Sequence, residues 1–424
     1  MSGLSYLEKL LDGVEVEWKR LGDVADIGTG SSNRQDENEK GIYPFYVRSK
    51  NVLRSDTFQF DETAIVIPGE GGIGDIFHYV EGKYSLHQRA YRICIKLSGL
   101  NTKFIYYFMS SGFKKYILMK KVGATSISIR KPMLEDFQIP IPCPDNPEKS
   151  LAIQSEIVRI LDTFTALTNE LTNELKLRRQ QYNYYREQLL SFKEGEVEWL
   201  SVSQIFNLKN GYTPSKSNKE YWENGDIPWF RMDDIRENGR ILGMSLQKIS
   251  YCAVKRGVLF PENSILISTS ATIGEYALIT VPHLANQRFT CLSLKLSYVE
   301  RFNIKFLFYY CFCLADWCRK NTTMSSFASV DMDGFRKFLF PIPYPNNPEK
   351  SLAFQSEIVR ILDKFDTLTN SISEGLPLEI ELRKKQYEYY RDLLFSFPKP
   401  VSANSLPAIK SQLALRCIAG IRSD

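Results

Sequence analysis

The chain has 424 residues, of which 43% are apolar and 24% are charged, and its formal net charge is +5. This length exceeds one ordinary domain and predicts two to four, and the apolar share allows most of the chain to bury a core. The surplus of positive charge is too small for a protein that binds nucleic acid by phosphate neutralisation alone. A nucleic-acid function therefore needs support from other features.

Cysteine use and the spread of apolar residues indicate the compartment. None of the eight cysteines forms a C-x-x-C pair, which favours reduced and mostly buried thiols. Residues 1–13 contain acidic side chains and no apolar segment of the kind found in signal peptides. No apolar run reaches the ~18 residues that a membrane span requires. We therefore expect a cytoplasmic protein.

Residues 14–144 form the first predicted globular domain. Apolar, β-branched blocks such as AIVIP and YRICI are bounded by Gly, Asn and Pro and predict strands, whereas TKFIYYFMSSGFKKYIL predicts a helix. The run PGEGGIG matches the G-x-G-x-x-G pattern of dinucleotide sites, which needs a helix after it to hold the pyrophosphate. The residues that follow, DIFHYV, indicate a strand instead, so we expect a β-turn here.

Residues 145–193 are predicted to form a long helix. The Pro-rich stretch IPIPCPDNP ends the strand pattern and leads into it. Apolar residues then recur at steps of four and three, as in the seam of a coiled coil. They are Ile153, Ile157, Ile160, Phe164, Leu167 and Leu171.

The second half of the chain repeats the first. PDNPEKSLAIQSEIVRILDTFTALTN (144–169) returns as PNNPEKSLAFQSEIVRILDKFDTLTN (345–370), an offset of 201 residues. QYNYYREQLLSF, from Gln181, returns as QYEYYRDLLFSF, from Gln386, an offset of 205 residues. The second copy therefore carries four extra residues. A period this long indicates a duplicated unit of one large domain and one long helix rather than a solenoid repeat.

The repeat defines the remaining regions. Residues 194–345 form a second mixed domain, and 346–398 a second helical region. Gly375 and Pro377 predict that one helix ends there and another starts. The two long helical regions, each with an apolar seam, should pack antiparallel and be related by a pseudo-two-fold axis. Residues 399–424 have no counterpart in the first copy, and no structure is predicted for them.

Four motifs carry a family resemblance over residues 5–398. NPEKSLAIQSEIVRILD, QYEYYRDLLFSF, SEGLPLEIELRKKQ and the tandem TNELTNEL resemble the helical regions of type I restriction–modification specificity subunits. The resemblance implies an α+β protein in which two target-recognition domains, 14–144 and 194–345, are joined by two long antiparallel helices acting as a coiled-coil spacer. Each domain would bind one half of a bipartite DNA target.

The same resemblance implies partners and a division of chemistry. The helices would bind two methyltransferase subunits, and restriction subunits would join through those. S-adenosylmethionine, ATP and magnesium would serve the partner subunits, while this chain would hold no cofactor, no metal and no catalytic residue.

Two other classes of function remain open: a stand-alone DNA-modifying enzyme and a helical scaffold without DNA binding. The sequence has no G-x-x-x-x-G-K-[ST] phosphate loop and no Asp/Asn-Pro-Pro-aromatic run of amino-methyltransferases. Cys311, Cys313 and Cys318 are expected to face a core rather than bind zinc. Asp233 and Asp234 could bind a metal, but they need no such role if they lie at the solvated surface, where we expect them.

Candidate DNA contacts are side chains with planar or cationic donors, or small polar groups, on loops framed by predicted strands. In the first domain they are Ser31, Asn33, Arg34, Gln35, Arg48, Lys50, Arg54, Gln88, Arg89, Ser126, Arg130 and Lys131. In the second they are Lys209, Tyr212, Thr213, Ser215, Lys216, Asn218, Arg231, Asp233, Gln287 and Arg288. The pairs Gln88–Arg89 and Gln287–Arg288 occupy corresponding places, which fits either a shared DNA contact or a shared structural hydrogen bond.

Overall fold

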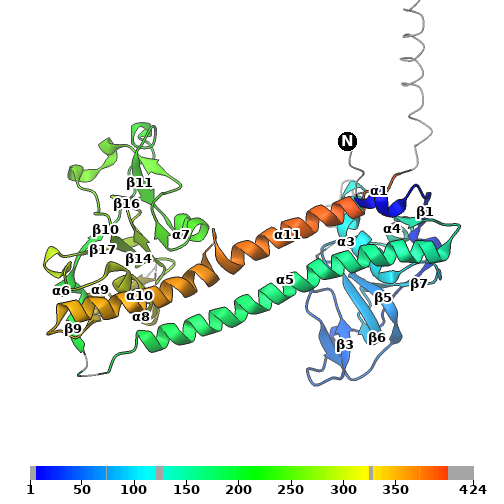
Figure 1. Ribbon diagram of the computed structural model, residues 1–424, viewed down its shortest axis with the longest axis horizontal. Helices are drawn as coiled ribbons and strands as arrows, with labels where there is room; N and C mark the ends of the chain where they lie inside the picture. The colour runs from blue at the N-terminus through cyan, green and yellow to red at the C-terminus, as the bar shows by residue number, and fades with distance from the viewer. Residues whose placement is uncertain are drawn as a thin grey trace, which may run out of the picture. The chain divides into compact units, whose positions relative to one another are not determined.

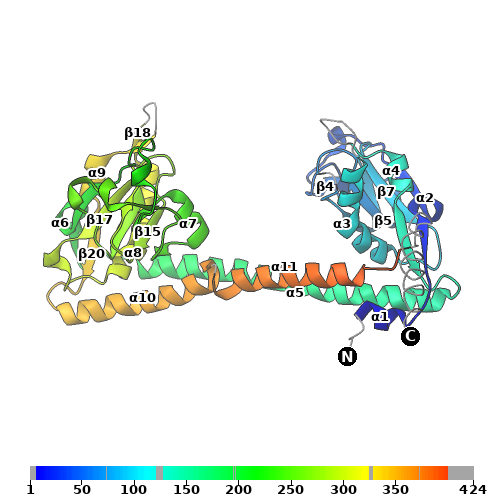
Figure 2. The same ribbon diagram turned by 90° about the horizontal axis from the view of Figure 1, so that it is seen from above.

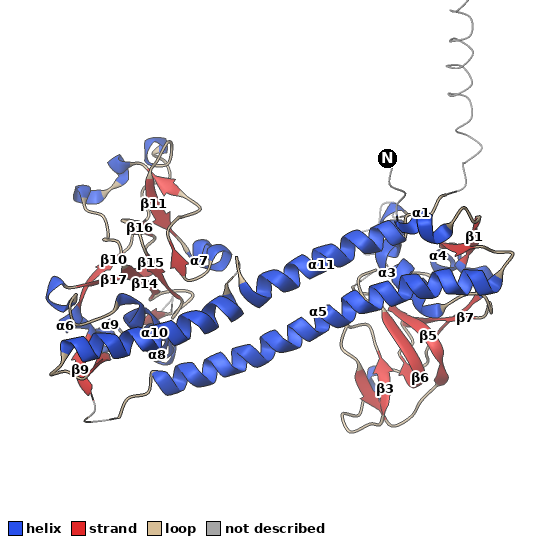
Figure 3. Cartoon of the chain, viewed as in Figure 1, coloured by secondary structure: helices blue, strands red, loops and turns tan. Residues whose placement is uncertain are grey.

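The computed structural model describes residues 6–72, 74–120, 128–193, 195, 197–323, 328–371 and 373–399. The chain divides into two compact units, the first made by residues 1–168 and 383–424 and the second by residues 169–382. Figures 1 and 2 show the labelled elements from two directions. Each unit contains both sheet and helix, which confirms the mixed α/β prediction (Figure 3).

The first unit is built on a six-stranded sheet in the order β2-β7-β5-β6-β3-β4. Its strands are β2 (Ala25–Thr29), β3 (Tyr43–Tyr46), β4 (Leu53–Ser55), β5 (Phe60–Pro68), β6 (His78–Leu86) and β7 (Ala90–Ile95). Helix α3 (Thr102–Met119) starts where the Asn101 side chain accepts the N–H groups of Lys103 and Phe104, and it packs against β5. A second sheet pairs β1 (Val16–Arg20) with β8 (Gln138–Pro142), and the short helices are α1 (Tyr6–Leu11), α2 (Leu21–Val24) and α4 (Lys131–Glu135).

The second unit has a five-stranded sheet in the order β10-β17-β14-β15-β12 and a three-stranded sheet in the order β13-β11-β16. These strands are β10 (Phe206–Asn210), β11 (Ile227–Phe230), β12 (Ile241–Leu242), β13 (Lys248–Ile249), β14 (Ser264–Ser268), β15 (Tyr276–Ile279), β16 (Leu284–Ala285) and β17 (Phe289–Leu294). Two small sheets pair β9 (Val197–Ser201) with β20 (Leu339–Pro343) and β18 (Thr322–Thr323) with β19 (Ser329–Val330). The helices are α6 (Val202–Ile205), α7 (Met232–Asn238), α8 (Ile304–Lys320) and α9 (Met332–Lys337).

The six-stranded sheet of the first unit and the two larger sheets of the second unit repeat one topology. Strand β3 runs parallel to β6 with Tyr46 opposite Leu86, and β11 runs parallel to β16 with Phe230 opposite Ala285. The single strand β6 of the first unit corresponds to β15 and β16 of the second. The internal repeat seen in the helical motifs therefore extends through the weakly similar globular regions.

Two smaller predictions can be checked against these units. Cys311 and Cys318 lie on the buried face of α8 in the core, and Cys313 of the same helix is half-buried against that core, as expected for a helix facing a core. The glycine-rich run around Gly71 forms a turn between β5 and β6, as predicted. Among the described residues, no helix combines the length and hydrophobicity that crossing a membrane would take.

The first predicted helix is continuous and the second is interrupted. Helix α5 (Pro147–Leu189) runs for 43 residues, whereas the second copy consists of α10 (Pro348–Asn370) and α11 (Gly375–Leu394). Gly375 has φ +74°, and a Cβ there would lie 2.4 Å from the carbonyl oxygen of Thr367. The predicted break is thus confirmed, and it falls in the stretch that carries the four extra residues.

A buried glutamine ties each globular region to its helix. The Oε1 of Gln355, on α10, accepts the N–H of Asn303 at 2.9 Å, and its Nε2 donates to the carbonyl of Arg301 at 3.0 Å. Gln355 also donates to Ser351 Oγ and is fully buried. Gln154, on α5, makes the equivalent bonds in the first unit.

An ion pair beside each glutamine repeats as well. Asp363 accepts from Lys305 Nζ at 2.7 Å and from Tyr309 Oη at 2.6 Å. Asp162 makes the same two bonds with the lysine and tyrosine of α3. The duplicated motifs NPEKSLA-x-QSEIVRILD therefore encode the docking surface between a helix and its domain.

Replacing Gln355 with Leu should destabilise the second unit by about 2–6 kcal/mol. The substitution leaves the N–H of Asn303 and the C=O of Arg301, both in partly buried residues, without their partner, and each such loss costs about 1–3 kcal/mol. Denaturant unfolding followed by tryptophan fluorescence measures this, since the second unit holds Trp199, Trp222, Trp229 and Trp317. Gln188→Leu, at an exposed position of α5, is the control and should change the free energy of unfolding little. Equal effects of the two variants would contradict the anchoring role.

Candidate nucleic-acid interface

A turn at the end of β6 and β16 has the same construction in both units. In the first, the backbone N–H of His87 donates to the last residue of β3, and His87 Nδ1 accepts the N–H of Arg89 at 3.0 Å. In the second, the N–H of Asn286 donates to the carbonyl of Phe230, and Asn286 Oδ1 accepts the N–H of Arg288 at 3.0 Å. An imidazole and an amide thus serve the same structural purpose.

The geometry of this turn bears on whether the shared Gln–Arg pairs make a DNA contact or a structural hydrogen bond. The backbone of Arg89 and Arg288 supplies the structural hydrogen bonds, while the side chains of both arginines and of Gln88 and Gln287 are exposed. Gln287 also accepts a hydrogen bond from the Thr213 hydroxyl. The conserved backbone geometry therefore leaves the side chains available for other contacts.

A cavity of about 670 Å³ lies beside this turn in the second unit. It gathers six of the residues predicted from the sequence, drawn from three separate segments of the chain. They are Thr213, Lys216, Arg231, Asp233, Gln287 and Arg288. Lys219 and Arg236 add two further cations to the lining.

Asp234 binds the backbone of Arg231, a residue in the lining of this cavity. The prediction that Asp234 lies at the solvated surface is wrong. Its carboxylate is fully buried and accepts the N–H groups of Arg231 and Leu246, each at 2.6 Å. It therefore anchors the first turn of α7, where a carboxylate also meets the positive end of the helix dipole. Asp233 next to it is half-exposed and lies 3.8 Å from guanidinium nitrogens of both Arg231 and Arg236.

Four predicted residues of the second domain do not line the cavity. The Tyr212 hydroxyl donates to the carbonyl of Ala253 and accepts the N–H of Lys255, so it has a structural role. Asn218 caps a short 3-10 turn, and Ser215 contacts Ser217. Lys209 lies on β10, and its side chain is exposed.

A cavity of about 410 Å³ occupies the corresponding place in the first unit. Of the predicted residues only Arg34 and Arg48 line it. Glu70, also in its lining, bridges Arg89 at 3.0 Å and Arg48 at 3.3 Å through one oxygen, Oε2. The hydrogen bond from Arg89, with the charge of both arginines, lowers the pKa of Glu70.

Glu70 is not among the residues predicted from the sequence, because the glycines of PGEGGIG indicate only a turn there. A signal was present in the alignment of the repeats, where ISTSATIG stands in place of IPGEGGIG. A lone carboxylate between glycines, at a position where the other copy has Ser270, marks a difference between two otherwise similar loops.

The remaining candidates of the first domain are spread over other surfaces. Asn33 caps the short turn that contains Arg34 and Gln35, and Ser31 contacts the amide of Gln59. Arg54 donates to the carbonyl of Ile42, and Lys131 lies 3.7 Å from Glu135. Lys50 and Arg130 are exposed, and Ser126 lies outside the described residues.

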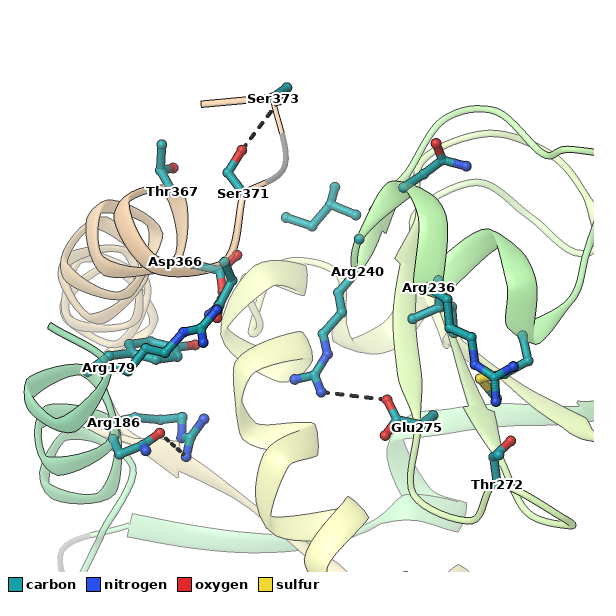
Figure 4. Close-up of a pocket in the computed structure, with 18 of the residues that line it drawn as sticks. Arg179, Arg186, Arg236, Arg240, Thr272, Glu275, Asp366, Thr367, Ser371 and Ser373 are labelled. Carbon is teal, nitrogen blue, oxygen red and sulfur yellow. Dashed lines mark hydrogen bonds and ion pairs between the residues drawn. The ribbon is translucent and has the colours of Figure 1, made fainter. Parts of the chain in front are cut away.

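The second unit also holds a larger, arginine-lined cavity of about 870 Å³ (Figure 4). Arg179 and Arg186 reach it from α5, Arg236 from α7 and Arg240 from the segment before β12. Figure 4 shows the α5 arginines on one side and Arg240, paired with Glu275 at 3.6 Å, between them and Arg236.

The arginines of this cavity are held in place by hydrogen bonds, ion pairs and contacts with aromatic rings. Arg179 donates to the carbonyl of Thr369 at 3.3 Å, and the guanidinium of Arg186 lies 3.5 Å from the centre of the Phe312 ring. Arg236 lines both this cavity and the smaller one, so α7 separates two adjoining basic surfaces. Sequence reasoning did not identify this cavity, because Arg179 and Arg186 stand among the polar positions of a long helix.

Comparison with known proteins gives concordant results. The family model "Type I restriction modification DNA specificity domain" matches residues 13–178 and again 194–382. The EcoR124I/EcoR124II type I specificity subunit of Escherichia coli is 40% identical over 425 residues, covering 96% of this chain and all of that protein. The EcoprrI specificity subunit of Escherichia coli is 78% identical over 202 residues, which is 48% of this chain and 50% of that protein.

A crystal structure of a type I restriction–modification S subunit from M. genitalium is similar in fold. It has a TM-score of 0.54 and 17% sequence identity, and the match covers 92% of this chain and 98% of that one. The two family matches fall on the two copies of the internal repeat. The chain therefore belongs to the DNA specificity subunits of type I restriction–modification systems, a family whose members are not themselves catalytic.

Proposed function

We propose that residues 14–144 and 194–345 each bind one half of a bipartite DNA target. The observation that carries this proposal is the repeated turn that presents an exposed Gln–Arg pair from the same backbone framework in both units. A guanidinium suits the O6 and N7 acceptors of guanine, and a carboxamide suits the N6 and N7 groups of adenine. A shared framework with different neighbouring side chains is what two readers of unlike half-sites require.

Within each domain the cavity beside the turn would receive base edges. In the second domain the proposed contacts are the six predicted residues of the 670 Å³ cavity. In the first they are Arg34, Arg48, Gln88 and Arg89. The other exposed candidates would contact phosphates, and they include Lys50, Arg130, Lys131 and Lys209. Contacts of this kind orient the protein on DNA and do not distinguish one base from another.

The helical regions 145–193 and 346–398 would set the spacing and dock two methyltransferase subunits. Within the second unit, α5 packs against α10 through Tyr185 and Phe365, whose ring centroids are 5.4 Å apart. Within the first, α5 packs against α11 through Phe164 and Tyr390. These contacts support antiparallel pairing, because higher numbers on α5 face lower numbers in the second copy.

Exposed tyrosines support two equivalent docking surfaces. Tyr184 is 61% exposed and Tyr389, its counterpart in the repeat, is 66% exposed. Tyrosine is favoured at protein interfaces, since it buries a large apolar ring and keeps a polar tip. Restriction subunits would join through the methyltransferase subunits. The partners would use S-adenosylmethionine, ATP and magnesium.

Arg288→Ala tests the proposed base contact in the second domain. In complex with methyltransferase subunits, the variant should lose roughly 5- to 140-fold discrimination at one position of one half-site, since a bidentate contact contributes about 1–3 kcal/mol. Sequencing of methylated sites measures this. Arg336→Ala, which removes an exposed arginine paired with Asp333 in the same unit, is the matched control. Unchanged preference at every position in the Arg288 variant would refute the contact.

The arginine-lined cavity is suited to the phosphate backbone, because its four arginines come from several elements and outnumber the two carboxylates of its lining, Glu275 and Asp366. Arg240→Ala should weaken binding to all DNA sequences alike and lower the slope of log affinity against log salt concentration by about one. Filter binding or fluorescence anisotropy over a salt series measures the slope. Arg178→Ala, whose arginine pairs with Glu174 on α5, should leave it unchanged. A change of target preference in the Arg240 variant would count against a phosphate role.

A further inference from the structure

The cluster Arg48–Glu70–Arg89 brings together three segments of the first unit. Glu70 lies in the turn after β5, Arg48 follows β3, and Arg89 precedes β7. Both guanidinium groups bond to Oε2 of Glu70, at 3.3 Å for Arg48 and 3.0 Å for Arg89. All three side chains are about half-exposed, at 49%, 43% and 54% in chain order.

The backbone beneath this cluster is tightly held. The N–H of Gly69 donates to the carbonyl of Arg89 at 2.9 Å, and its own carbonyl accepts the N–H of Ile129 at 2.8 Å. A Cβ at residue 69 would also lie 2.9 Å from the carbonyl oxygen of Arg89. The carboxylate therefore projects from a fixed point directly beside the Gln–Arg turn.

The second unit has the same backbone and a different side chain. The N–H of Thr269 donates to the carbonyl of Arg288 at 3.0 Å, so Thr269 takes the place of Gly69 and Ser270 takes the place of Glu70. The two copies thus differ by a carboxylate at one position of an otherwise matched framework. Such a difference is expected where two domains read different bases.

The charge of the cluster favours a base edge over a phosphate. A carboxylate held between two guanidiniums cancels one of their two charges and repels a phosphate oxygen nearby. It also restricts two long side chains that would otherwise sample many rotamers, and restraint of this kind favours contacts with strict geometry. Each guanidinium has five donors, so most remain free after the bond to Glu70.

We propose that the Arg48–Glu70–Arg89 cluster reads a G·C base pair in the half-site of the first domain, with Glu70 as the specificity-determining residue that positions both arginines. The arginines donate to the O6 and N7 atoms of guanine, the base whose major-groove acceptors fit a guanidinium. This inference rests on the proposed function, in which this surface faces DNA. Ser270 leaves Arg288 without such a restraint, so the second domain has a different preference.

Glu70→Gln tests the positioning role with little change of shape. In complex with the methyltransferase subunits, the variant should lose roughly 5- to 140-fold discrimination at one G·C position of one half-site, and the other half-site should stay unchanged. Asp136→Asn is the matched control, since Asp136 also bridges two cations, Arg20 at 2.8 Å and Lys120 at 3.3 Å, elsewhere in the same unit. Its methylation pattern should remain that of the wild type.

Two further variants separate the possible failures. Ser270→Glu should change the preference of the other half-site alone, because it places a carboxylate beside Arg288. If Arg89→Ala alters no position, the proposed DNA contact of this surface is wrong. If Arg89→Ala alters a position and Glu70→Gln does not, or if the affected pair is A·T, the inference about Glu70 is overturned while the DNA contact stands. Thermal unfolding of each complex shows whether a change comes from loss of folding instead.

Discussion

Deleting one Thr-Asn-Glu-Leu unit, residues 172–175, is expected to shorten the gap between the two half-sites by one to two base pairs and to leave both half-sites unchanged. Residues 168–175 form a tandem of this unit within the uninterrupted helix α5. Four helical residues span about 6 Å at ~1.5 Å per residue, and one step along a DNA strand is about 3.4 Å.

The deletion changes length while leaving helix phase nearly intact. Four residues correspond to about 400° of helix rotation at ~3.6 residues per turn, so the remaining seam is turned by only about 40°. Sequencing of methylated sites in cells that carry the variant and intact partner subunits gives the new gap. Asn173→Ala, which alters the same unit without changing its length, is the control and should keep the original gap. An altered half-site, or an unchanged gap, would contradict the role of α5 as a spacer.

Asp234→Ala is expected to destabilise the second unit by about 3–6 kcal/mol and to abolish recognition of one half-site. The buried carboxylate satisfies two backbone N–H groups at 2.6 Å, and hydrogen bonds to a charged group contribute about 1.5–3 kcal/mol each. Without it the first turn of α7 loses its anchor, and Arg231 and Arg236 lose their fixed positions in the cavity lining.

Denaturant unfolding measures the loss of stability, and binding to duplexes with one scrambled half-site shows which domain has failed. Asp233→Ala is the control, because that carboxylate is half-exposed and its ion pairs are long, at 3.8 Å. An exposed pair of this kind contributes about 0–1 kcal/mol. If both variants lose similar stability, the cap on α7 is not what holds the cavity together.

Features encoded in neighbouring residues could be predicted from the sequence. The stripe of apolar residues predicted the long helix found as α5, and Gly375 with Pro377 predicted the interruption that separates α10 from α11. These predictions succeed because helix periodicity and the backbone limits of glycine and proline act within a few residues. The duplication was likewise visible as near-identity of two segments, and it correctly implied two related mixed domains.

The candidate DNA-binding site depends on contacts between segments that are distant in the chain. The sequence could suggest the residues but not which of them come together. The pairing of β11 with β16 brings Arg231 beside Gln287 and Arg288, whereas Lys209 and Tyr212 of the same domain lie elsewhere or serve the fold. A surface residue and a buried anchor can also look identical in sequence, as Asp233 and Asp234 do.

The amino-acid sequence by itself thus determined the duplicated plan, the helices with their single break, and the family. Only the tertiary structure decided that Glu70 bridges Arg48 and Arg89, that Asp234 in the first turn of α7 is buried, and that arginines of α5 and α7 share one cavity. The physical reason is the separation along the chain over which each kind of interaction acts. Backbone propensity acts along the chain over a few residues, while charge pairing, burial and cavity formation depend on which remote segments the folded sheets bring together.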